Sequence, residues 1–125
     1  MSVRLTTLKK RADFVRIAKQ GQKWVSPGLI VQAMRRPISL SEDADLLRVG
    51  FTASKKVGNA VARNRAKRRL RAVIRDLKNQ ADQNLDFVLI ARQSTVDYDY
   101  DKLTRETYKA FKKLPKLVHQ GRKPR

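Results

Sequence analysis

The segment from Lys55 to Lys78 carries the strongest chemical signal in the chain. It contains ten lysines and arginines but only one acid, Asp76. Ammonium and guanidinium groups at this density attract phosphate, whereas a merely solvated helix face normally interleaves glutamate with lysine. The segment therefore predicts a surface that holds a polyanion.

Side chains suited to catalysis or metal ligation are scarce by comparison. The chain has no cysteine and one histidine, His119, so thiolate metal sites, histidine clusters and Ser-His-Asp triads are not expected. Asp97, Asp99 and Asp101 come nearest to a carboxylate cluster, but acids at that spacing before a helix are typical of helix capping. We expect no catalytic residue and no metal site in the protein.

The overall charge points to the same class of partner. The 125 residues carry a net charge of +19 with 41% apolar residues, which predicts one domain that binds nucleic acid or an anionic membrane. No apolar run is long enough to span a bilayer, and the start of the chain, "MSVRLTTLKKRADF", lacks the apolar stretch of a signal peptide. These features favour a cytoplasmic protein with a nucleic-acid partner.

The elements that position the basic segment can be read from apolar periodicity and turn residues. We expect a first helix from Thr6 or Thr7 to about Gln20, ended by Gly21. Strands are expected at Gly28–Arg36, Leu46–Ser54 and Asp86–Gln93, an acidic loop between the first two, and a last helix from Asp99 or Asp101 to Leu114. This order predicts an α+β sandwich formed by residues 1–114, followed by a basic, flexible tail at 115–125.

The basic segment itself is predicted to be an amphipathic helix between two strands. At about 100° per residue, its apolar residues form one stripe that must face the sheet: Ala62, Ala66, Leu70, Val73 and Leu77. The opposite face carries Asn64, Arg68, Arg71 and Arg75, with Arg65, Lys67 and Lys78 along its sides. No acid interleaves with these cations, so anion binding is favoured over a solvated face.

The start of this helix has the features of a phosphate site. Gly58 permits a tight turn and Asn59 is a good N-cap, so free backbone N–H groups lie at the positive end of the helix dipole. Lys55 and Lys56 precede the turn, and Arg63 follows it. A glycine-asparagine turn is common, but its combination with these cations is specific.

The string "SKKVGNAVARNRAKRRLR" resembles the signature of the protein subunit of bacterial ribonuclease P, whose centre is an Arg-Asn-Arg helix. The resemblance extends through "LRVGFTASKK" and "DFVLIAR" and back to "LKKRADFVRIAKQG", so it covers about Leu8 to Leu114. Together, the residues and the resemblance predict an RNA-binding set: Lys55, Lys56, Asn59, Arg63, Asn64, Arg65, Lys67, Arg68, Arg71 and Arg75.

The resemblance also implies a fold and a function. The implied fold is an α-β-β-β-α-β-α sandwich like the second domain of ribosomal protein S5, with a left-handed βαβ crossover that ordinary units avoid. The implied function is that of a subunit: a catalytic RNA, using bound Mg²⁺, removes the 5′ leader from precursor tRNA. The protein binds that RNA and the leader, broadens the substrate range and lowers the Mg²⁺ requirement. No protein partner and no membrane are implied.

The first helix is the expected contact with the leader. Leu8, Ala12 and Val15 form one apolar strip, and the resemblance suggests that a second strip, with a neighbouring strand, lines the leader cleft: Phe14, Ile17, Ala18 and Gln32. Stacking of an unpaired base on Phe14 is worth about 1–3 kcal/mol. Relatives often carry aromatics where this chain has Ala18 and Gln32, which predicts a more polar contact. Burial of Phe14 in the core is an equal alternative.

Other classes of protein remain as alternatives. A ribosomal or other structured-RNA-binding protein with an S5-like fold would use the basic helix equally well, but would not need the whole Lys-Lys-x-Gly-Asn-Ala and Arg-Asn-Arg string. A helix-turn-helix DNA binder requires two short helices around a tight turn, not a basic helix between strands. A self-sufficient nuclease would cleave precursor tRNA without any RNA subunit.

Overall fold

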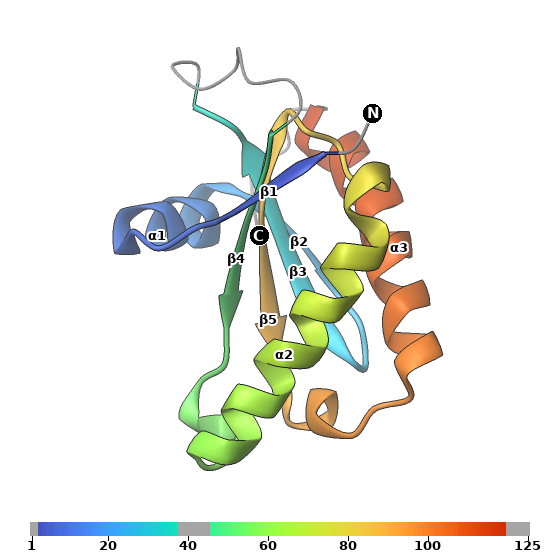
Figure 1. Cartoon of the computed structure of the whole chain (residues 1–125). Coiled ribbons are helices and arrows are strands. Elements are labelled where there is room, and N and C mark those ends of the chain that lie inside the picture. Colours follow the sequence, from blue (N-terminus) through green and yellow to red (C-terminus); the bar gives the residue numbers. More distant parts are fainter. Residues whose placement is uncertain (1–2, 38–45, 120–125) are drawn as a thin grey trace.

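The computed structural model describes residues 3–37 and 46–119, which form one five-stranded sheet flanked by three helices (Figure 1). The strands lie in the order β1-β4-β5-β3-β2. Their bounds are β1 Arg4–Thr7, β2 Gln22–Val25, β3 Leu29–Arg35, β4 Leu46–Thr52 and β5 Leu85–Ala91. The helices are α1 Arg11–Gln20, α2 Ala60–Leu77 and α3 Tyr100–His119, with α2 and α3 on one face of the sheet and α1 on the other. The expected α+β sandwich is confirmed.

The basic helix α2 connects two neighbouring parallel strands, β4 and β5. Val49 of β4 lies opposite Phe87 of β5 in this parallel register. In Figure 1 both strands point down, α2 lies in front of them, and β5 lies to the right of β4. When the view is rotated so that both strands point up and α2 stays in front of the sheet, the chain passes from β4 through α2 to β5 on the left. This is the left-handed sense. The unusual crossover is therefore present.

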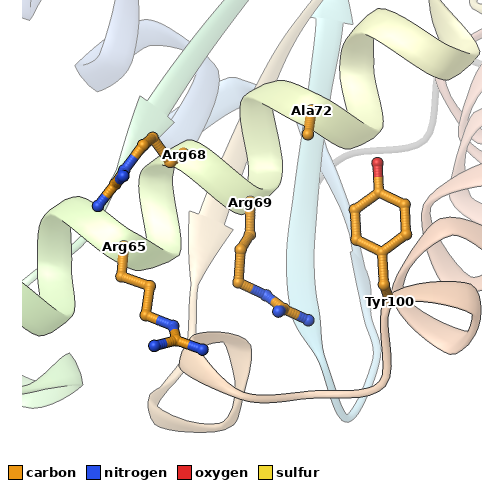
Figure 2. A pocket seen from close by; sticks show the side chains of 5 residues that line it. All are labelled: Arg65, Arg68, Arg69, Ala72 and Tyr100. Carbon is orange, nitrogen blue, oxygen red and sulfur yellow. The ribbon is translucent and has the colours of Figure 1, made fainter.

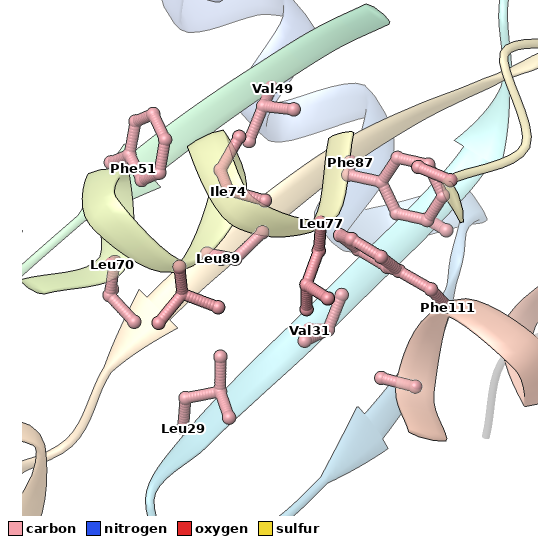
Figure 3. Close-up of a cluster of buried hydrophobic side chains, with 14 of the residues drawn as sticks. Leu29, Val31, Val49, Phe51, Leu70, Ile74, Leu77, Phe87, Leu89 and Phe111 are labelled. Carbon is pink, nitrogen blue, oxygen red and sulfur yellow. The ribbon is translucent and has the colours of Figure 1, made fainter. Parts of the chain in front are cut away.

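The main core lies between the sheet and helices α2 and α3. Strand β3 alternates buried Leu29, Val31 and Ala33 with half-buried residues, as expected for one covered face. The ring centroids of Phe87 on β5 and Phe111 on α3 are 4.8 Å apart (Figure 3). This core fixes both helices against the same face, so the outer side of α2 is left for other contacts.

A smaller core and a buried ion network attach α1 to the opposite face. Asp86 on β5 is fully buried, and its Oδ2 lies 2.8 Å from Nη2 of Arg16 and 3.2 Å from Nη1 of Arg48. Nε of Arg36 lies 3.9 Å from its Oδ1. Burial raises the pKa of Asp86, while Arg48, Arg16 and Arg36 act in the opposite direction. The carboxylate thus joins α1, β4 and the residue that follows β3 to β5.

The periodicity missed two strands, β1 and β2, of which the fold implied by the resemblance lacked only β1; the first helix also begins later than expected. Residues Arg4–Thr7, in which Thr6 or Thr7 was expected to cap the helix, form β1 and pair in parallel with β4. Helix α1 begins at Arg11, and Lys10, its N-cap, makes no side-chain capping bond. The predicted end at Gly21 is confirmed, because its N–H donates to the carbonyl of Ile17 over 2.9 Å.

The last helix is longer than expected at its C-terminal end. Asp99 caps it as expected, since Oδ2 accepts from the N–H of Lys102 over 3.0 Å. The helix then continues through Pro115 to His119, so residues 115–119 are not part of a flexible tail. Leu117 and Val118 pack against the main core, which favours the helix despite the proline. The acidic loop at 38–45 and the rest of the tail lie outside the described residues.

The replacement Asp86→Asn tests the ion network. We expect it to destabilise the fold by about 3 kcal/mol, because three arginines then lose the carboxylate that balances them, while the amide oxygen still accepts a hydrogen bond. The melting temperature should fall by on the order of 10 °C, measured by circular dichroism. The control is Asp97→Asn, an exposed carboxylate, which should change little. A matching small effect for both replacements would contradict the role given to Asp86.

Candidate RNA-binding surface

Helix α2 presents its apolar stripe to the sheet and its cations to solvent. Ala66, Leu70, Val73 and Leu77 are buried as predicted, and Ala62 is half-buried. Ile74 is also buried, although the sequence analysis did not include it in the stripe. The rotation of the helix predicted from its periodicity is therefore correct.

The predicted RNA-binding residues lie together along the outer side of α2 and the turn that precedes it. Eight of them are exposed: Lys55, Lys56, Asn59, Asn64, Arg65, Arg68, Arg71 and Arg75. Arg63 and Lys67 are half-buried at the edge of the helix nearest the sheet. Within residues 3–37 and 46–119, no cation of α2 forms an ion pair with a carboxylate. We call these ten residues the α2 surface.

The turn before α2 has the geometry expected of an anion site. Ser54 accepts from the N–H of Lys56 over 3.3 Å, and Asn59 Oδ1 accepts from the N–H of Ala62 over 2.9 Å, so the predicted N-cap is confirmed. Gly58 has a φ of 145°, which side chains disfavour, and this explains the glycine. The turn places Lys55 and Lys56 at the positive end of the helix dipole.

Contacts along its flanks fix several arginines of α2 in place. Arg65 Nε donates to the carbonyl of Val96 over 3.1 Å, and Arg69 Nη2 donates to the carbonyl of Tyr98. On the opposite flank, the guanidinium of Arg71 lies 5.6 Å from the ring centroid of Phe51. These arginines are held in fixed positions, which lowers the entropy that they lose when they bind a phosphate.

The sequence analysis missed two residues that line a groove beside α2, Arg69 and Tyr100. Figure 2 shows the groove, which is also lined by Arg65, Arg68 and Ala72. The four-residue spacing of Arg65 and Arg69 was a signal that both lie on one flank of the helix. Nothing local indicated Tyr100, because it approaches α2 only through the tertiary fold.

The predicted leader-cleft residues lie on the α1 face of the sheet, but not all are accessible. Ile17 is only 1% exposed and packs against Leu8 and Val88, so it is a core residue and the expectation that it lines a cleft is wrong. Phe14 is half-buried, and Gln32 on β3 is half-buried with it. Ala18 is exposed. Phe14, Ala18 and Gln32 therefore stay candidates for contact with a single strand.

A single apolar stripe, and not two, attaches α1 to the sheet. Phe14 and Ile17 form that stripe. Of the other expected strip, Leu8 is buried beside Ile17, while Ala12 and Val15 face solvent, with Val15 38% exposed. The ring of Phe14 lies directly over Gly50, where a Cβ would come within 2.6 Å of its Cε1. Phe14 thus combines a packing contact with a side chain that is still partly exposed.

Metal ligation and membrane insertion find no support in the part of the chain that the structure describes. In those residues, no three histidine, cysteine, aspartate or glutamate side chains gather closely enough to hold a metal ion. None of the helices described is both long and apolar enough to cross a bilayer. The α2 surface is thus the dominant chemical feature.

Comparison with known proteins gives one consistent result. The family model named Ribonuclease P matches residues 3–115. The ribonuclease P protein component of Paramagnetospirillum magneticum is 50% identical over 119 residues, which is 94% of this chain and 88% of that protein. The corresponding protein of Gluconacetobacter diazotrophicus is 42% identical over 114 residues, with 90% and 94% covered.

Solved structures share the fold. The RNase P protein of Staphylococcus aureus superimposes with a TM-score of 0.69 at 31% identity, covering 86% of this chain and 95% of that one. The RNase P protein of Thermotoga maritima gives a TM-score of 0.70 at 24% identity, covering 86% and 96%. The comparison of sequences and the comparison of structures thus agree with each other.

Two alanine replacements on α1 test the distinction between the buried and the half-buried side chain. Ile17→Ala should destabilise the fold by about 3 kcal/mol, because it leaves a cavity among Leu8 and Val88. Phe14→Ala should cost less, about 1–2 kcal/mol, since part of the ring is already in water. Urea unfolding measures both, and Val15→Ala serves as the exposed control. A larger loss for Phe14→Ala than for Ile17→Ala would reverse the two assignments.

Proposed function

The chain belongs to the ribonuclease P protein family, and from that premise we propose that it is the protein subunit of a ribonuclease P ribonucleoprotein in the cytoplasm. The particle removes the 5′ leader from precursor tRNA. The chain covers most of the length of the relatives that it matches. The match along residues 3–115 favours this function over a ribosomal protein.

The single observation that carries the proposal is the α2 surface. It is a row of cations without paired acids, which suits a folded RNA whose phosphates are close together. The described residues contain no carboxylate cluster that would hold two metal ions for hydrolysis. Catalysis then belongs to the RNA partner, which binds the Mg²⁺, and the protein acts by binding.

Charge neutralisation accounts for the proposed effect on the Mg²⁺ requirement. An RNA of this kind needs cations to bring its own phosphates and those of the substrate together. Cations on α2, with Lys55 and Lys56 before it, supply part of that charge in fixed positions. Less Mg²⁺ is then needed for folding and for substrate binding.

The leader is proposed to lie on the opposite face, beside α1. Phe14 offers the exposed part of its ring, and Ala18 and Gln32 add a small and a polar contact. Stacking tolerates any base, which suits a leader of variable sequence. Two faces thus serve two RNAs, with α2 for the catalytic RNA and the α1 face for the substrate.

Reconstitution tests the proposed division of labour. The purified protein alone should not cleave precursor tRNA, while its addition to the cognate RNA subunit at low Mg²⁺ should increase cleavage. The reason is that the protein contributes charge and substrate contact but no catalytic groups. Cleavage is followed by gel electrophoresis of labelled precursor tRNA. Specific Mg²⁺-dependent cleavage by protein freed of RNA would overturn the proposal.

Arginine replacements on the α2 surface test RNA binding itself. Arg68→Ala and Arg75→Ala should each weaken binding to the RNA subunit at unchanged thermal stability, because both side chains are exposed and outside the apolar stripe. Each lost phosphate contact should flatten the log–log salt dependence of the affinity by about one unit at most. Arg105→Ala on the outer side of α3 removes the same charge elsewhere and serves as the control. Equal effects of all three would show that only net charge matters.

Phe14→Ala tests the leader contact. It should weaken binding of the holoenzyme to precursor tRNA by about five- to 100-fold, the range for one lost base stack, and leave mature tRNA little affected. Competition binding with both tRNAs measures the difference. Equal losses for the two tRNAs would show that Phe14 does not contact the leader.

A further inference from the structure

The groove between α2 and the start of α3 has a composition that the general RNA-binding function leaves unexplained. It has a volume of about 330 Å³ and is lined by three arginines, one tyrosine and one alanine: Arg65, Arg68, Arg69, Tyr100 and Ala72. Ligand pockets begin at about 300 Å³, so the groove has room for one small planar group with its phosphate. Three cations and an aromatic ring meet here within about one turn of helix.

Two of the three arginines of the groove, Arg65 and Arg69, are held by hydrogen bonds and not merely solvated. Arg65 and Arg69 extend toward the segment that leads to Tyr100 and bind its backbone carbonyls at Val96 and Tyr98 (Figure 2). Because Arg65 is held through Nε, its two terminal nitrogens keep their hydrogens for another acceptor. Arg68, on the same helix, has no bonded partner within the described ranges. The groove thus offers oriented donors to an anion.

No carboxylate of the described chain supplies that anion. The acid nearest along α2 is Asp76, and its Oδ2 accepts from the hydroxyl of Tyr100 over 2.9 Å. Glu106 of α3 accepts from the hydroxyl of Tyr98 and from the N–H of Gly28. Both acids are therefore engaged by neutral donors. No ion pair in the described residues neutralises these arginines, so their charge is available to a bound anion.

The ring of Tyr100 forms a fixed aromatic wall. Its hydroxyl is tied to Asp76, and the guanidinium of Arg69 lies 6.0 Å from its centroid. Burial and the bond to Asp76 raise the pKa of Tyr100, so the phenol keeps its proton and stays a donor. Ala72, opposite the ring on α2, is small and leaves the groove open. A wall of this kind suits a flat base better than a sugar or a simple ion.

We propose that this groove holds one unstacked nucleotide of the RNA partner, with its phosphate on Arg65 and Arg68 and its base against Tyr100 and Ala72. The inference rests on the proposed RNA-binding function and adds a specific subsite to it. A duplex backbone would use the arginines alone, because its bases are stacked inside the helix. The groove therefore distinguishes a bulged or looped nucleotide from regular duplex RNA.

Photo-crosslinking locates the bound base directly. The full chain is irradiated with an oligouridine of about 12 nucleotides, a usual site size, that carries 4-thiouridine, and the adduct is mapped by mass spectrometry. We expect an adduct on the peptide that contains Tyr100, kept in Tyr100→Phe and lost in Ala72→Leu, where the larger side chain fills the groove. Adducts that map only elsewhere, as on the α1 face, would overturn the proposal.

Affinity measurements distinguish the contribution of the Tyr100 ring to RNA binding from that of its hydroxyl and from a loss of folding. Tyr100→Leu should weaken binding to the ribonuclease P RNA about five- to 100-fold, the effect of one lost base stack, while Tyr100→Phe stays within about two-fold. A blunt RNA duplex should bind wild type and Tyr100→Leu equally. Thermal melting confirms that each variant is folded. Equal losses for Leu and Phe, or no loss for either, would overturn the base contact.

The outcome also separates this inference from the proposed function. Arg75 lies on α2 but does not line the groove. If Arg75→Ala weakens binding to the ribonuclease P RNA and Tyr100→Leu does not, the protein is an RNA-binding subunit without this nucleotide site. If the wild-type chain binds neither that RNA nor the oligouridine, both proposals fall together.

Discussion

The packing of α2 against the sheet is the interaction on which the rest of the structure depends. This helix has seven lysines and arginines and one aspartate in 18 residues, so its charges repel one another. Each like-charge pair at helical spacing costs a few tenths of a kcal/mol, whereas each fully buried aliphatic side chain contributes about 1.5–3 kcal/mol. Burial of Leu70, Val73, Ile74 and Leu77 therefore outweighs the repulsion. The sheet holds a surface that would not persist on an isolated peptide.

The chain uses arginine in two opposite ways. On the α1 face, Arg16, Arg36 and Arg48 surround the buried carboxylate of Asp86, and Asp13 also pairs with Arg16 and Arg48, so most of their charge is neutralised within the fold. On α2, Arg65 and Arg69 bind backbone carbonyls and Arg71 lies over the ring of Phe51, contacts that orient a guanidinium but do not neutralise it. The arginines around Asp86 are thus paired with carboxylates, whereas the arginines of α2 have no carboxylate partner in the described residues and can bind an anionic partner. This difference separates structural from functional arginines.

The periodicity of the sequence predicted the parts of the fold that bury a long apolar stripe. The inward stripe of α2, its Asn59 cap and the strands expected at Gly28–Arg36 and Leu46–Ser54 are all local patterns, and the structure has them. Strands β1 and β2 have only four residues each, too few to show alternation; β1 depends on pairing with distant β4, and β2 on pairing with β3, which follows it. Pro115 was read as a helix end, but tertiary packing of Leu117 and Val118 overrides that local signal.

Features formed by residues far apart in the sequence could not be predicted from the sequence alone. The partners of Asp86 come from positions 16, 36 and 48, so its strand pattern gave no sign of a buried ion network. The groove at Tyr100 forms because α3 begins beside the middle of α2. Ile17 and Phe14 have similar local surroundings, and only the sheet decides which is buried. The resemblance predicted the left-handed crossover, which no periodicity encodes.

Chemical footprinting of lysine and arginine side chains in the complex with the ribonuclease P RNA tests the central claim most directly. The account predicts that the RNA protects Lys55, Lys56, Arg68 and Arg75 from modification, while Arg105 and Lys109 on the outer side of α3 stay reactive. Mass spectrometry gives the degree of modification at each residue, free and bound. Protection on α3 with the α2 residues unchanged would contradict the assignment of α2 as the surface that binds the RNA.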